Sequence, residues 1–526
     1  MEQEIQTYTE PVRRLSIPRL FLVFAILGGL SVGTAHSFAD FKNVALGGDA
    51  YAPWFASYVD VTSMPTYAFE KHGDTNESDV VLSFIVSHKD EPCIPTWGGY
   101  FNLNEIASQR DLERRIARLQ QQGGRIAVSF GGAYNSELAL HCTDHELLFS
   151  AYKSVIDRYN INTIDIDLEN ESLRNTEAGV RRAEVIARLQ THYREAGKPL
   201  AVWLTLPVAP FGMTKEGTDA VDVMLKAKVD LAGVNVMTMN YGPSREELSI
   251  ADASIKALKE LQRQLGILYK QNGFALSQET LWSKVGATPM IGQNDIADEV
   301  FTIEDAAALN TFAVAQKVGR MSMWSANRDI PCGENYVDVK RVSDVCSGVK
   351  TPTLLFAQTL AQGFVGDLMQ NANMLTVSDP EANLEIIDNP ETSPYQIWKD
   401  TGIYLRGTKV VWRGNVYEAK WWTKNELPDN PVLQSFETPW QLIGPVLPDD
   451  KPMEQLELPS GTFPRWSGQA VYDAGDRVLF DGVPFRAKWW NQGESPAISA
   501  VNPESSPWIP LSQDQIREIL KAQGRL

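Results

Sequence analysis

The stretch NTIDIDLEN, residues 162–170, places three carboxylates at alternate positions. Asp165, Asp167 and Glu169 alternate with isoleucine and leucine side chains. This period of two predicts a β-strand with one aliphatic face and one carboxylate face. Acids crowded on one face resist simultaneous ionisation, so one of them can stay protonated near neutral pH. The pattern therefore favours proton chemistry, with Glu169 as the donor to a leaving oxygen.

The same three carboxylates are compatible with two other interpretations. A solvated acidic edge strand conflicts with the continuous aliphatic residues on the opposite face. A divalent-metal site is chemically reasonable, because Asp-x-Asp-x-Glu can supply hard oxygen ligands. The six histidines form no His-x-x-His pair, which leaves little basis for zinc. We favour proton chemistry and expect neither a metal nor another cofactor.

Short apolar runs alternate with helical patterns from about residue 48 to residue 370. The predicted strands are 51–59, 80–86, 125–132, 163–169, 200–208, 231–239, 285–292 and 319–326. Amphipathic stretches at 112–122, 146–159 and 307–318 predict helices between them. This alternation predicts an α/β fold whose parallel strands close into a (β/α)8 TIM barrel. An open doubly wound sheet is the alternative, but no Gly-x-Gly-x-x-Gly motif opens any of the helices.

The fourth predicted strand would carry its carboxylates on the inner face of such a barrel. Catalytic groups of this fold lie at the C-terminal ends of the strands. Glu169 therefore belongs at the barrel mouth, with Asp167 and Asp165 progressively deeper. The aliphatic residues on the other face would pack beneath the helices.

The C-terminal part of the chain contains an internal repeat with an offset of 68 residues. Trp398, Trp421, Trp422 and Trp440 recur as Trp466, Trp489, Trp490 and Trp508. The sequence Ala-Lys-Trp-Trp at 419–422 returns at 487–490. We therefore expect two small all-β modules behind the barrel.

These patterns divide the chain into consecutive segments. They are an N-terminal signal or anchor (1–39), the barrel (45–375), a linker (376–394), a first module (395–445), a second linker (446–462), a second module (463–510) and a tail (511–526).

The first segment contains an uncharged, mostly apolar run at residues 20–33, which follows Arg13, Arg14 and Arg19. The run is short for a membrane span and suits the apolar part of a secretory signal peptide. An uncleaved N-terminal membrane anchor is the alternative. Both predict an extracellular location for the rest of the chain, either secreted or held at the outer face of the plasma membrane.

In that compartment the four cysteines predict two disulfides rather than metal ligands, since no Cys-x-x-Cys pair exists. Cys93 follows the second predicted strand and Cys142 follows the third, so adjacent loops can bring them together. Cys332 and Cys346 bracket one loop after the eighth strand. We predict the pairs Cys93–Cys142 and Cys332–Cys346.

The composition restricts the partners of this chain. A formal net charge of −18 argues against nucleic acid, whose phosphates demand a basic surface. An aromatic content of 10% suits a neutral ligand better. We expect a monomer.

The fourth strand resembles that of the family 18 glycoside hydrolases, chitinases and their relatives, which carries Asp-Gly-x-Asp-x-Asp-x-Glu. Residues 162–169 match its last five positions, with Asn162 for the first aspartate and Thr163 for the glycine. The sequence SFGG at 129–132 resembles the family's Ser-x-Gly-Gly on the third strand. Residues 288–295 resemble the seventh strand of some bacterial members.

This resemblance, which spans residues 48–370, implies substrate-assisted hydrolysis. Glu169 would protonate the glycosidic oxygen while the substrate's own N-acetyl carbonyl attacks the anomeric carbon. Asp167 would orient the acetamido group and stabilise the charge of the oxazolinium intermediate. Asp165 would hold Asp167 protonated or turned away from Glu169. The mechanism needs no metal.

The resemblance also implies contacts to the substrate on the sixth and eighth strands. The family's Met-x-Tyr-Asp aligns with residues 237–240, which puts Met239 at the tyrosine and Asn240 at the aspartate. Tyr241 either supplies a hydroxyl from a shifted position or packs under a loop. Trp324 resembles the tryptophan that forms the floor of the sugar site.

Two further candidates for substrate contact have structural alternatives. Trp54 either lines the cleft or fills the barrel mouth. Gln293 either faces the sugar or caps the end of the seventh strand.

The two C-terminal modules resemble small chitin- or cellulose-binding domains with a Tyr-x-Ala-x-Trp-Trp core. Flat aromatic rings stack on the apolar face of a pyranose, and linked modules gain by avidity. The candidate rings are Trp421, Trp422, Trp489 and Trp490. In each pair we expect one ring to pack in the module and the other to be exposed, while a purely structural role as a miniature core is the alternative.

The resemblance predicts an exported chitinase that cleaves β-1,4-linked N-acetylglucosamine polymers, with tail modules that adsorb to insoluble polysaccharide. One alternative is a chitin-binding lectin on the same barrel. The other is a hydrolase of a different N-acetylglucosamine glycan, such as peptidoglycan or an N-glycan. Intact Glu169 and Asp167 favour an enzyme, and tandem modules favour an insoluble polymer.

Overall fold

The computed structural model describes most of the chain. The described residues are 52–71, 79–368 and 387–525, apart from 335, 337, 339, 351, 354, 367, 453–455, 457, 460, 481–482, 498–504 and 512. The predicted signal or anchor at 1–39 and most of the predicted linker at 376–394 lie outside them. Within these ranges no helix combines the length and the apolar character that crossing a membrane requires.

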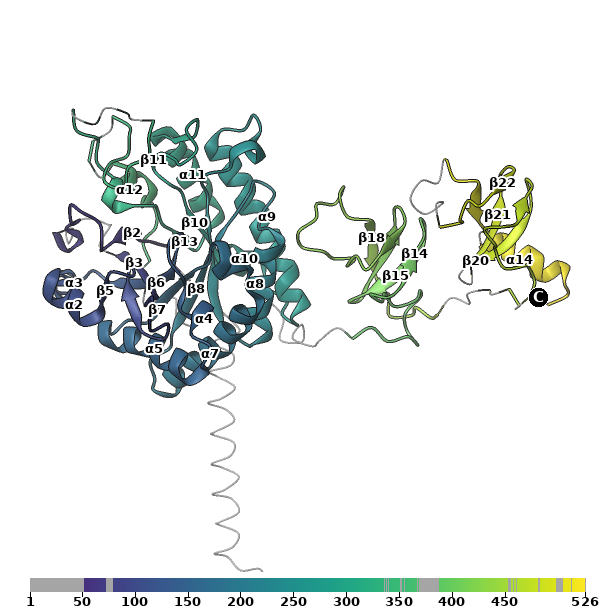
Figure 1. Cartoon of the computed structure of the whole chain (residues 1–526), viewed down its shortest axis with the longest axis horizontal. Helices are drawn as coiled ribbons and strands as arrows, with labels where there is room; N and C mark the ends of the chain where they lie inside the picture. The colour runs from purple at the N-terminus through teal and green to yellow at the C-terminus, as the bar shows by residue number, and fades with distance from the viewer. Residues whose placement is uncertain are drawn as a thin grey trace, which may run out of the picture.

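Parallel strands gather at the centre of the first domain (Figure 1). They are β1 (Trp54–Phe55), β2 (Ser57–Asp60), β3 (Val80–Ser87), β6 (Ile126–Gly131), β7 (Thr163–Asp167), β8 (Ala201–Pro207), β9 (Leu231–Met237), β10 (Val285–Thr288) and β13 (Arg320–Met321). From β2 onward each strand pairs in parallel with the next. β1 pairs with β13, so the segment 54–60 has a parallel neighbour on each side. The predicted α/β fold with a parallel sheet is confirmed.

Helices connect these strands and lie outside them (Figure 1). The longer ones are α3 (Leu112–Gln121), α5 (His145–Tyr159), α7 (Thr176–Glu195), α8 (Lys215–Lys226), α9 (Ile250–Gln271) and α11 (Ile303–Gln316). The shorter ones are α2 (Leu103–Gln109), α4 (Leu138–His141), α6 (Asn170–Arg174), α10 (Gln278–Ser283), α12 (Leu355–Leu360) and the 3-10 turns η1 (Phe69–Lys71), η2 (Gly242–Arg245) and η3 (Ala326–Arg328). Helix α11 begins before its predicted start because Thr302 and Asp305 form a capping box there.

Small residues on the inner face of the barrel make room for two tryptophans. Trp54 and Trp203 are fully buried and meet edge to face, with ring centroids 5.7 Å apart. A Cβ on Gly233 would lie 2.3 Å from the Trp203 ring, so only glycine fits there. Trp54 begins the first strand and packs at the N-terminal end of the barrel. Its proposed place in the cleft or mouth is therefore wrong.

The seventh and eighth strands are shorter than predicted. β10 ends at Thr288, where Pro289 cannot donate to a strand ladder. The chain then forms β11 (Gly292–Gln293), which pairs antiparallel with β12 (Val300–Phe301).

Both predicted disulfides are confirmed. Cys93 is bonded to Cys142, and Cys332 is bonded to Cys346. The first bond ties the loop after β3, which includes the hairpin of β4 (Pro95–Trp97) and β5 (Phe101–Asn102), to the loop after β6. The second closes a loop after β13.

Two similar β units follow the barrel (Figure 1). The first contains β14 (Ile403–Tyr404), β15 (Lys409–Trp412), β16 (Asn415–Ala419), β17 (Thr423–Lys424) and β18 (Trp440–Pro445). The second contains β19 (Val471–Tyr472), β20 (Arg477–Phe480), β21 (Val483–Ala487), β22 (Asn491–Gln492) and β23 (Trp508–Pro510). Corresponding strands pair in the same antiparallel way.

The buried cores of the two units also use corresponding positions. They are Tyr404, Val410, Tyr417, Ala419 and Trp440 in the first, and Tyr472, Val478, Phe485, Ala487 and Trp508 in the second. The last segment, expected as a tail, contains helix α14 (Gln513–Ala522). Its Ile516 and Leu520 pack against Leu456 of the second linker.

Candidate active site

The three carboxylates lie along β7 and just beyond its end. Asp165 and Asp167 are buried, with exposed fractions of 1% and 4%. Glu169 follows the strand, is half-buried and forms the N-cap of α6. Gly131 on the neighbouring strand has φ 110°, and a Cβ there would lie 2.0 Å from the Asp167 carbonyl oxygen. Glycine in the SFGG sequence thus permits the close approach of β6 to the carboxylates.

Asp165 is enclosed by hydrogen-bond donors from four other strands. Its partners are Arg320 Nη1 at 2.6 Å, Ser129 Oγ at 2.7 Å, Thr205 Oγ1 at 2.7 Å and Tyr58 OH at 2.8 Å. The guanidinium compensates the charge of the carboxylate, and both groups are 1% exposed. Asp165 therefore has no lone pair directed at a ligand, and its surroundings hold it in one orientation.

Asp167 has the opposite environment. Its Oδ1 is buried, and no described residue gives it a hydrogen bond. Burial, followed by the charges of Glu169 and Asp165, raises the pKa of Asp167 well above its usual range, against a smaller opposing effect of Arg320. The protonated form of Asp167 is therefore favoured more than in an exposed aspartate, and that form can donate a hydrogen bond to a ligand.

Glu169 is poised to exchange a proton near neutral pH. Burial, together with the negative charge of Asp295, raises the pKa of Glu169 to about 7. Asp295 follows β11 and is positioned by Asn240, whose Nδ2 donates to its carboxylate at 2.7 Å. The Asp295 amide in turn donates to Asn240 Oδ1 at 2.9 Å. A carboxylic acid with this pKa suits general acid–base catalysis.

Stacked aromatic rings lie beside the carboxylates. Phe84 and Trp324 are half-buried, with ring centroids 5.4 Å apart and planes inclined by 23°. Tyr58, which bonds Asp165, lies 6.0 Å from the Trp324 ring. A Cβ on Gly132 would lie 2.9 Å from Phe84, so the SFGG sequence also packs against this stack. Trp324 is therefore placed where a sugar ring at the carboxylates could rest on it.

Two predicted substrate contacts are wrong. The Tyr241 side chain is buried in the outer core, and its hydroxyl donates to Ser254 of α9 at 3.0 Å. Gln293 is 3% exposed, and its Nε2 donates to backbone carbonyls of its own loop, including Asn294 at 3.1 Å. Both side chains have a structural role instead, which was the alternative given for each of them. Met239 is half-buried, as is Asn240.

Several residues of the site were missed in the sequence. They are Tyr58, Thr205, Asn235, Asp295 and Arg320. Asn235 Nδ2 donates to Thr205 Oγ1 at 3.0 Å and extends the network around Asp165. The available signal was a polar residue inside an apolar strand, such as the arginine in GRMSMWSA.

The tryptophan pairs of the two β units are largely accessible. Trp421 is 41% exposed, while Trp489 and Trp490 are 42% and 59% exposed. Trp422 is half-buried. The expectation that one ring of each pair packs in the core is therefore wrong for the second unit. The ammonium groups of Lys420 and Lys488 lie 4.8 and 4.5 Å from the centroids of the Trp421 and Trp489 rings.

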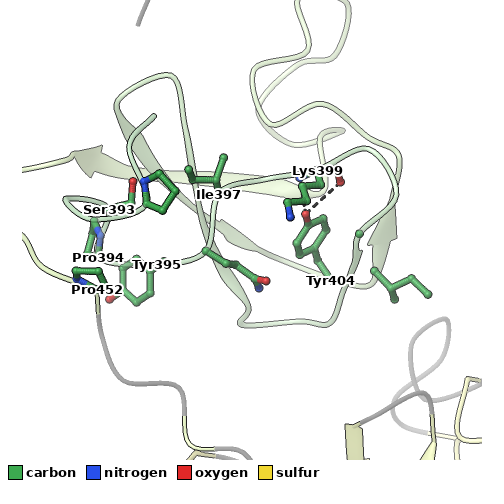
Figure 2. Close-up of a pocket in the computed structure, with 11 residues that line it drawn as sticks. Ser393, Pro394, Tyr395, Ile397, Lys399, Tyr404 and Pro452 are labelled. Atoms are coloured by element: carbon green, nitrogen blue, oxygen red, sulfur yellow. Dashed lines mark hydrogen bonds between the residues drawn. The ribbon is translucent and has the colours of Figure 1, made fainter. Parts of the chain in front are cut away.

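Two other features bear on the choice of site. A cavity of about 520 Å³ opens in the first β unit, between Pro390, Tyr395, Tyr404 and Pro452 (Figure 2). The Tyr404 hydroxyl accepts from the Lys399 amide at 2.7 Å, and none of the described residues that line the cavity is a carboxylate. Over the described ranges, no cluster of three or more His, Cys, Asp or Glu residues is arranged to hold a metal ion.

Comparison with known proteins finds a carbohydrate-binding module family and several chitinases that are similar to parts of this chain. Carbohydrate-binding module family 5/12 matches residues 465–508. A probable bifunctional chitinase/lysozyme of Escherichia coli K12 is 32% identical over 291 residues, covering 53% of this chain and 31% of that protein. Endochitinase 11 of Metarhizium anisopliae is 31% identical over 287 residues, covering 53% of this chain and 52% of that protein. The chain thus spans between about a third and about half of the length of these relatives.

A solved structure resembles the barrel. It contains catalytic-site mutants of active domain 2 of a thermostable chitinase from Pyrococcus furiosus, complexed with chito-oligosaccharides. The likeness has a TM-score of 0.50 and 28% identity, and covers 59% of this chain and 94% of that chain. The barrel is therefore similar to the catalytic domains of chitinases, which are glycoside hydrolases, and residues 465–508 behind it match a carbohydrate-binding module.

Proposed function

We propose that this chain hydrolyses chitin, a β-1,4-linked polymer of N-acetylglucosamine, with Glu169 as the general acid. The observation that carries the proposal is the environment of the β7 carboxylates. The pKa of Glu169 is raised to about 7, and the deeper Asp167 is buried with one oxygen that accepts no hydrogen bond from any described residue. The likeness to chitinases supplies the substrate class.

The reaction would be substrate-assisted and retain the anomeric configuration. Glu169 gives its proton to the glycosidic oxygen as that bond breaks. The acetamido carbonyl oxygen of the sugar attacks the anomeric carbon and forms an oxazolinium ion. A water molecule then opens this ion and passes a proton to the Glu169 carboxylate, which restores the acid.

Asp167 would hold the acetamido group in place for this attack. The raised pKa of Asp167 favours its protonated form, and its Oδ1, which has no hydrogen-bond partner among the described residues, can bond to the acetamido group. Asp165 would favour the protonated form of Asp167, because its charge raises the pKa of Asp167. Hydrogen bonds to Arg320 and three hydroxyls hold Asp165 in place for this role. Trp324 would form the floor beneath the sugar, and Asn240 would act through Asp295.

The test of this assignment is Glu169→Gln, which keeps the shape of the side chain and removes the acid. We expect loss of at least about 100-fold in the hydrolysis of chitin oligosaccharides, with the thermal unfolding curve unchanged. The matched control is Glu171→Gln, in the first turn of α6 and two residues away. Chromatography of the products would measure the rates. Turnover by Glu169→Gln at the wild-type rate contradicts the assignment, and tight binding without turnover by the wild type would favour a lectin.

We also propose that the two β units act as tandem modules that adsorb to insoluble chitin. Their shared strand pairing and core support this, as does the exposure of Trp421, Trp489 and Trp490. Linked modules convert the second contact into an intramolecular one.

Alanine at Trp422 and Trp490 together should therefore lower adsorption more than either change alone. Each change should cost roughly 5-fold or more, because an aromatic stacking platform contributes about 1–3 kcal/mol to a flat ligand. Leu447→Ala, at an exposed position in the linker directly after the first unit, is the control. Depletion of protein from a chitin suspension measures this, and equal adsorption by the double variant and the wild type would assign the modules to another task.

A second candidate substrate is the N-acetylglucosamine-containing backbone of peptidoglycan. The Escherichia coli relative is named a probable bifunctional chitinase/lysozyme, which supports this option. Turbidity of a cell-wall suspension, measured beside chitin hydrolysis, separates the two. We further propose that the protein is exported, since disulfides persist in oxidising compartments. Detection of the protein with both bonds in culture medium would test this.

A further inference from the structure

Two tyrosine side chains extend into solvent from the adjacent loops that follow β3 and β6. Tyr100, in the turn between β4 and β5, is 77% exposed. Tyr134, in the loop after β6, is 86% exposed. Exposed aromatic side chains that gather near a binding site are a common sign of ligand contact.

Tyr134 belongs to a loop that contacts the residue directly after the proposed acid. Asn170, which directly follows Glu169, donates its Nδ2 to the carbonyl oxygen of Ala133 at 3.3 Å. Tyr134 is the next residue along that loop. The Tyr134 ring is therefore carried by the residue next to the one that accepts this hydrogen bond from Asn170.

The same loop holds the turn that carries Tyr100. Asn135 donates its Nδ2 to the Gly98 carbonyl at 3.0 Å, and a Cβ on Gly99 would lie 3.4 Å from Asn135 Oδ1. A Cβ on Gly98, where φ is 60°, would meet both Thr62 of the preceding barrel loop and the Tyr100 ring at 3.0 and 3.2 Å. The two tyrosines thus flank one close contact between adjacent loops.

These loops are held in place by a covalent bond. The Cys93–Cys142 disulfide joins the loop of Tyr100 to that of Tyr134. Ordered loops matter for binding, because a ring that is already positioned loses less conformational freedom when a ligand stacks on it.

From this placement we propose that Tyr100 and Tyr134 form a stacking surface for further pyranose units of the polymer whose scissile bond lies at Glu169. The proposal rests on the proposed function and adds a preference for chain length. A short oligosaccharide would fill only the region over Trp324 and the carboxylates. A longer one would reach the tyrosine rings, whose flat faces match the apolar face of a neutral sugar.

The experiment compares kcat/KM for the hexasaccharide and the trisaccharide of N-acetylglucosamine. We expect Tyr100→Ala and Tyr134→Ala each to lower the hexasaccharide-to-trisaccharide ratio roughly 5- to 50-fold. Tyr134→Phe keeps the ring and should restore the ratio. Val365→Ala is the control, since Val365 is 84% exposed beside Gly366, which bridges Trp54 at the opposite end of the barrel.

A double alanine variant with the wild-type ratio would overturn the stacking surface and leave the proposed function standing. A wild-type protein that cleaves neither oligosaccharide would overturn the proposed function instead. Calorimetric binding of the hexasaccharide to Glu169→Gln, with and without Tyr134→Ala, then still decides the inference. A dissociation constant raised by Tyr134→Ala supports it, and an unchanged constant refutes it.

Discussion

The lower interior of the barrel and its mouth place carboxylates from the same strand in opposite surroundings. Around Asp165, an arginine and three hydroxyls satisfy the carboxylate from all sides. Toward the mouth, Asp167 is buried with an oxygen that has no partner among the described residues, and Glu169 has a pKa of about 7. The hydrogen bonds of the lower region hold Asp165 in one orientation, whereas the carboxylates at the mouth can exchange protons and bind a ligand.

The difference shows how one motif can combine a structural part and a chemical part. Hydrogen bonds and a cation make a buried charge tolerable. A buried acid without them retains its proton. Two residues along one strand separate the ion-paired carboxylate from the buried acid that lacks such partners, because successive inward side chains lie at different depths in the barrel.

The largest expected effect comes from removing the cation of the lower region. Arg320→Met leaves the buried charge of Asp165 without its ion partner and should destabilise the fold by about 3–5 kcal/mol. The double variant Asp165→Asn, Arg320→Met should recover much of this loss, because neither of the two replaced side chains is then charged. Chemical denaturation of the three proteins measures it. If Arg320→Met unfolds at the wild-type denaturant concentration, the lower region does not have the structural role assigned to it.

Sequence patterns predicted the three carboxylates of residues 162–170 but not the side chains that surround them. The strand period and the position of Glu169 at the strand end follow from local spacing, and the disulfides follow from loop adjacency. The Arg320–Asp165 pair joins residues 155 positions apart, so no local pattern indicates it. Tyr241 was misplaced because β9 ends at Met237 and Asn240 has φ 54°, which breaks the alternation of faces. Gln293 was misplaced because the chain leaves the parallel sheet after Thr288.

A smaller effect on folding, of opposite sign, is expected at the mouth from Asp167→Asn. Its folded-state pKa is raised above the unfolded value, so its contribution to stability is present at low pH and is lost as pH rises through the folded pKa. The asparagine cannot ionise, so the variant should gain stability relative to the wild type as the pH rises from about 4, the unfolded-state pKa, to the raised folded-state pKa. Activity should fall about 100-fold or more, since a group that stabilises the transition state is altered.

Thermal unfolding across this pH range, recorded beside oligosaccharide hydrolysis, measures both effects. Asp165→Asn is the informative contrast, because Asp165 is already compensated by Arg320. A wild type and an Asp167→Asn variant whose melting temperatures run parallel at all pH values would mean that Asp167 is not held protonated by the fold.

The smallest expected effect concerns an exposed charge at the rim of the mouth. After burial, the negative charge of Asp295 is the other cause that raises the pKa of Glu169 to about 7. Removing that charge in Asp295→Asn should lower the pKa of Glu169. Because the acid must be protonated to act, the alkaline limb of the kcat/KM profile should move to lower pH, and kcat/KM at about pH 8 should fall by up to about tenfold.

Asp298→Asn, which removes an exposed carboxylate on the same loop, is the matched control. Added salt screens exposed charges and should shrink the difference between wild type and Asp295→Asn. Equal shifts of the alkaline limb in Asp295→Asn and Asp298→Asn would show that the effect comes from net surface charge. The raised pKa of Glu169 would then result from burial alone.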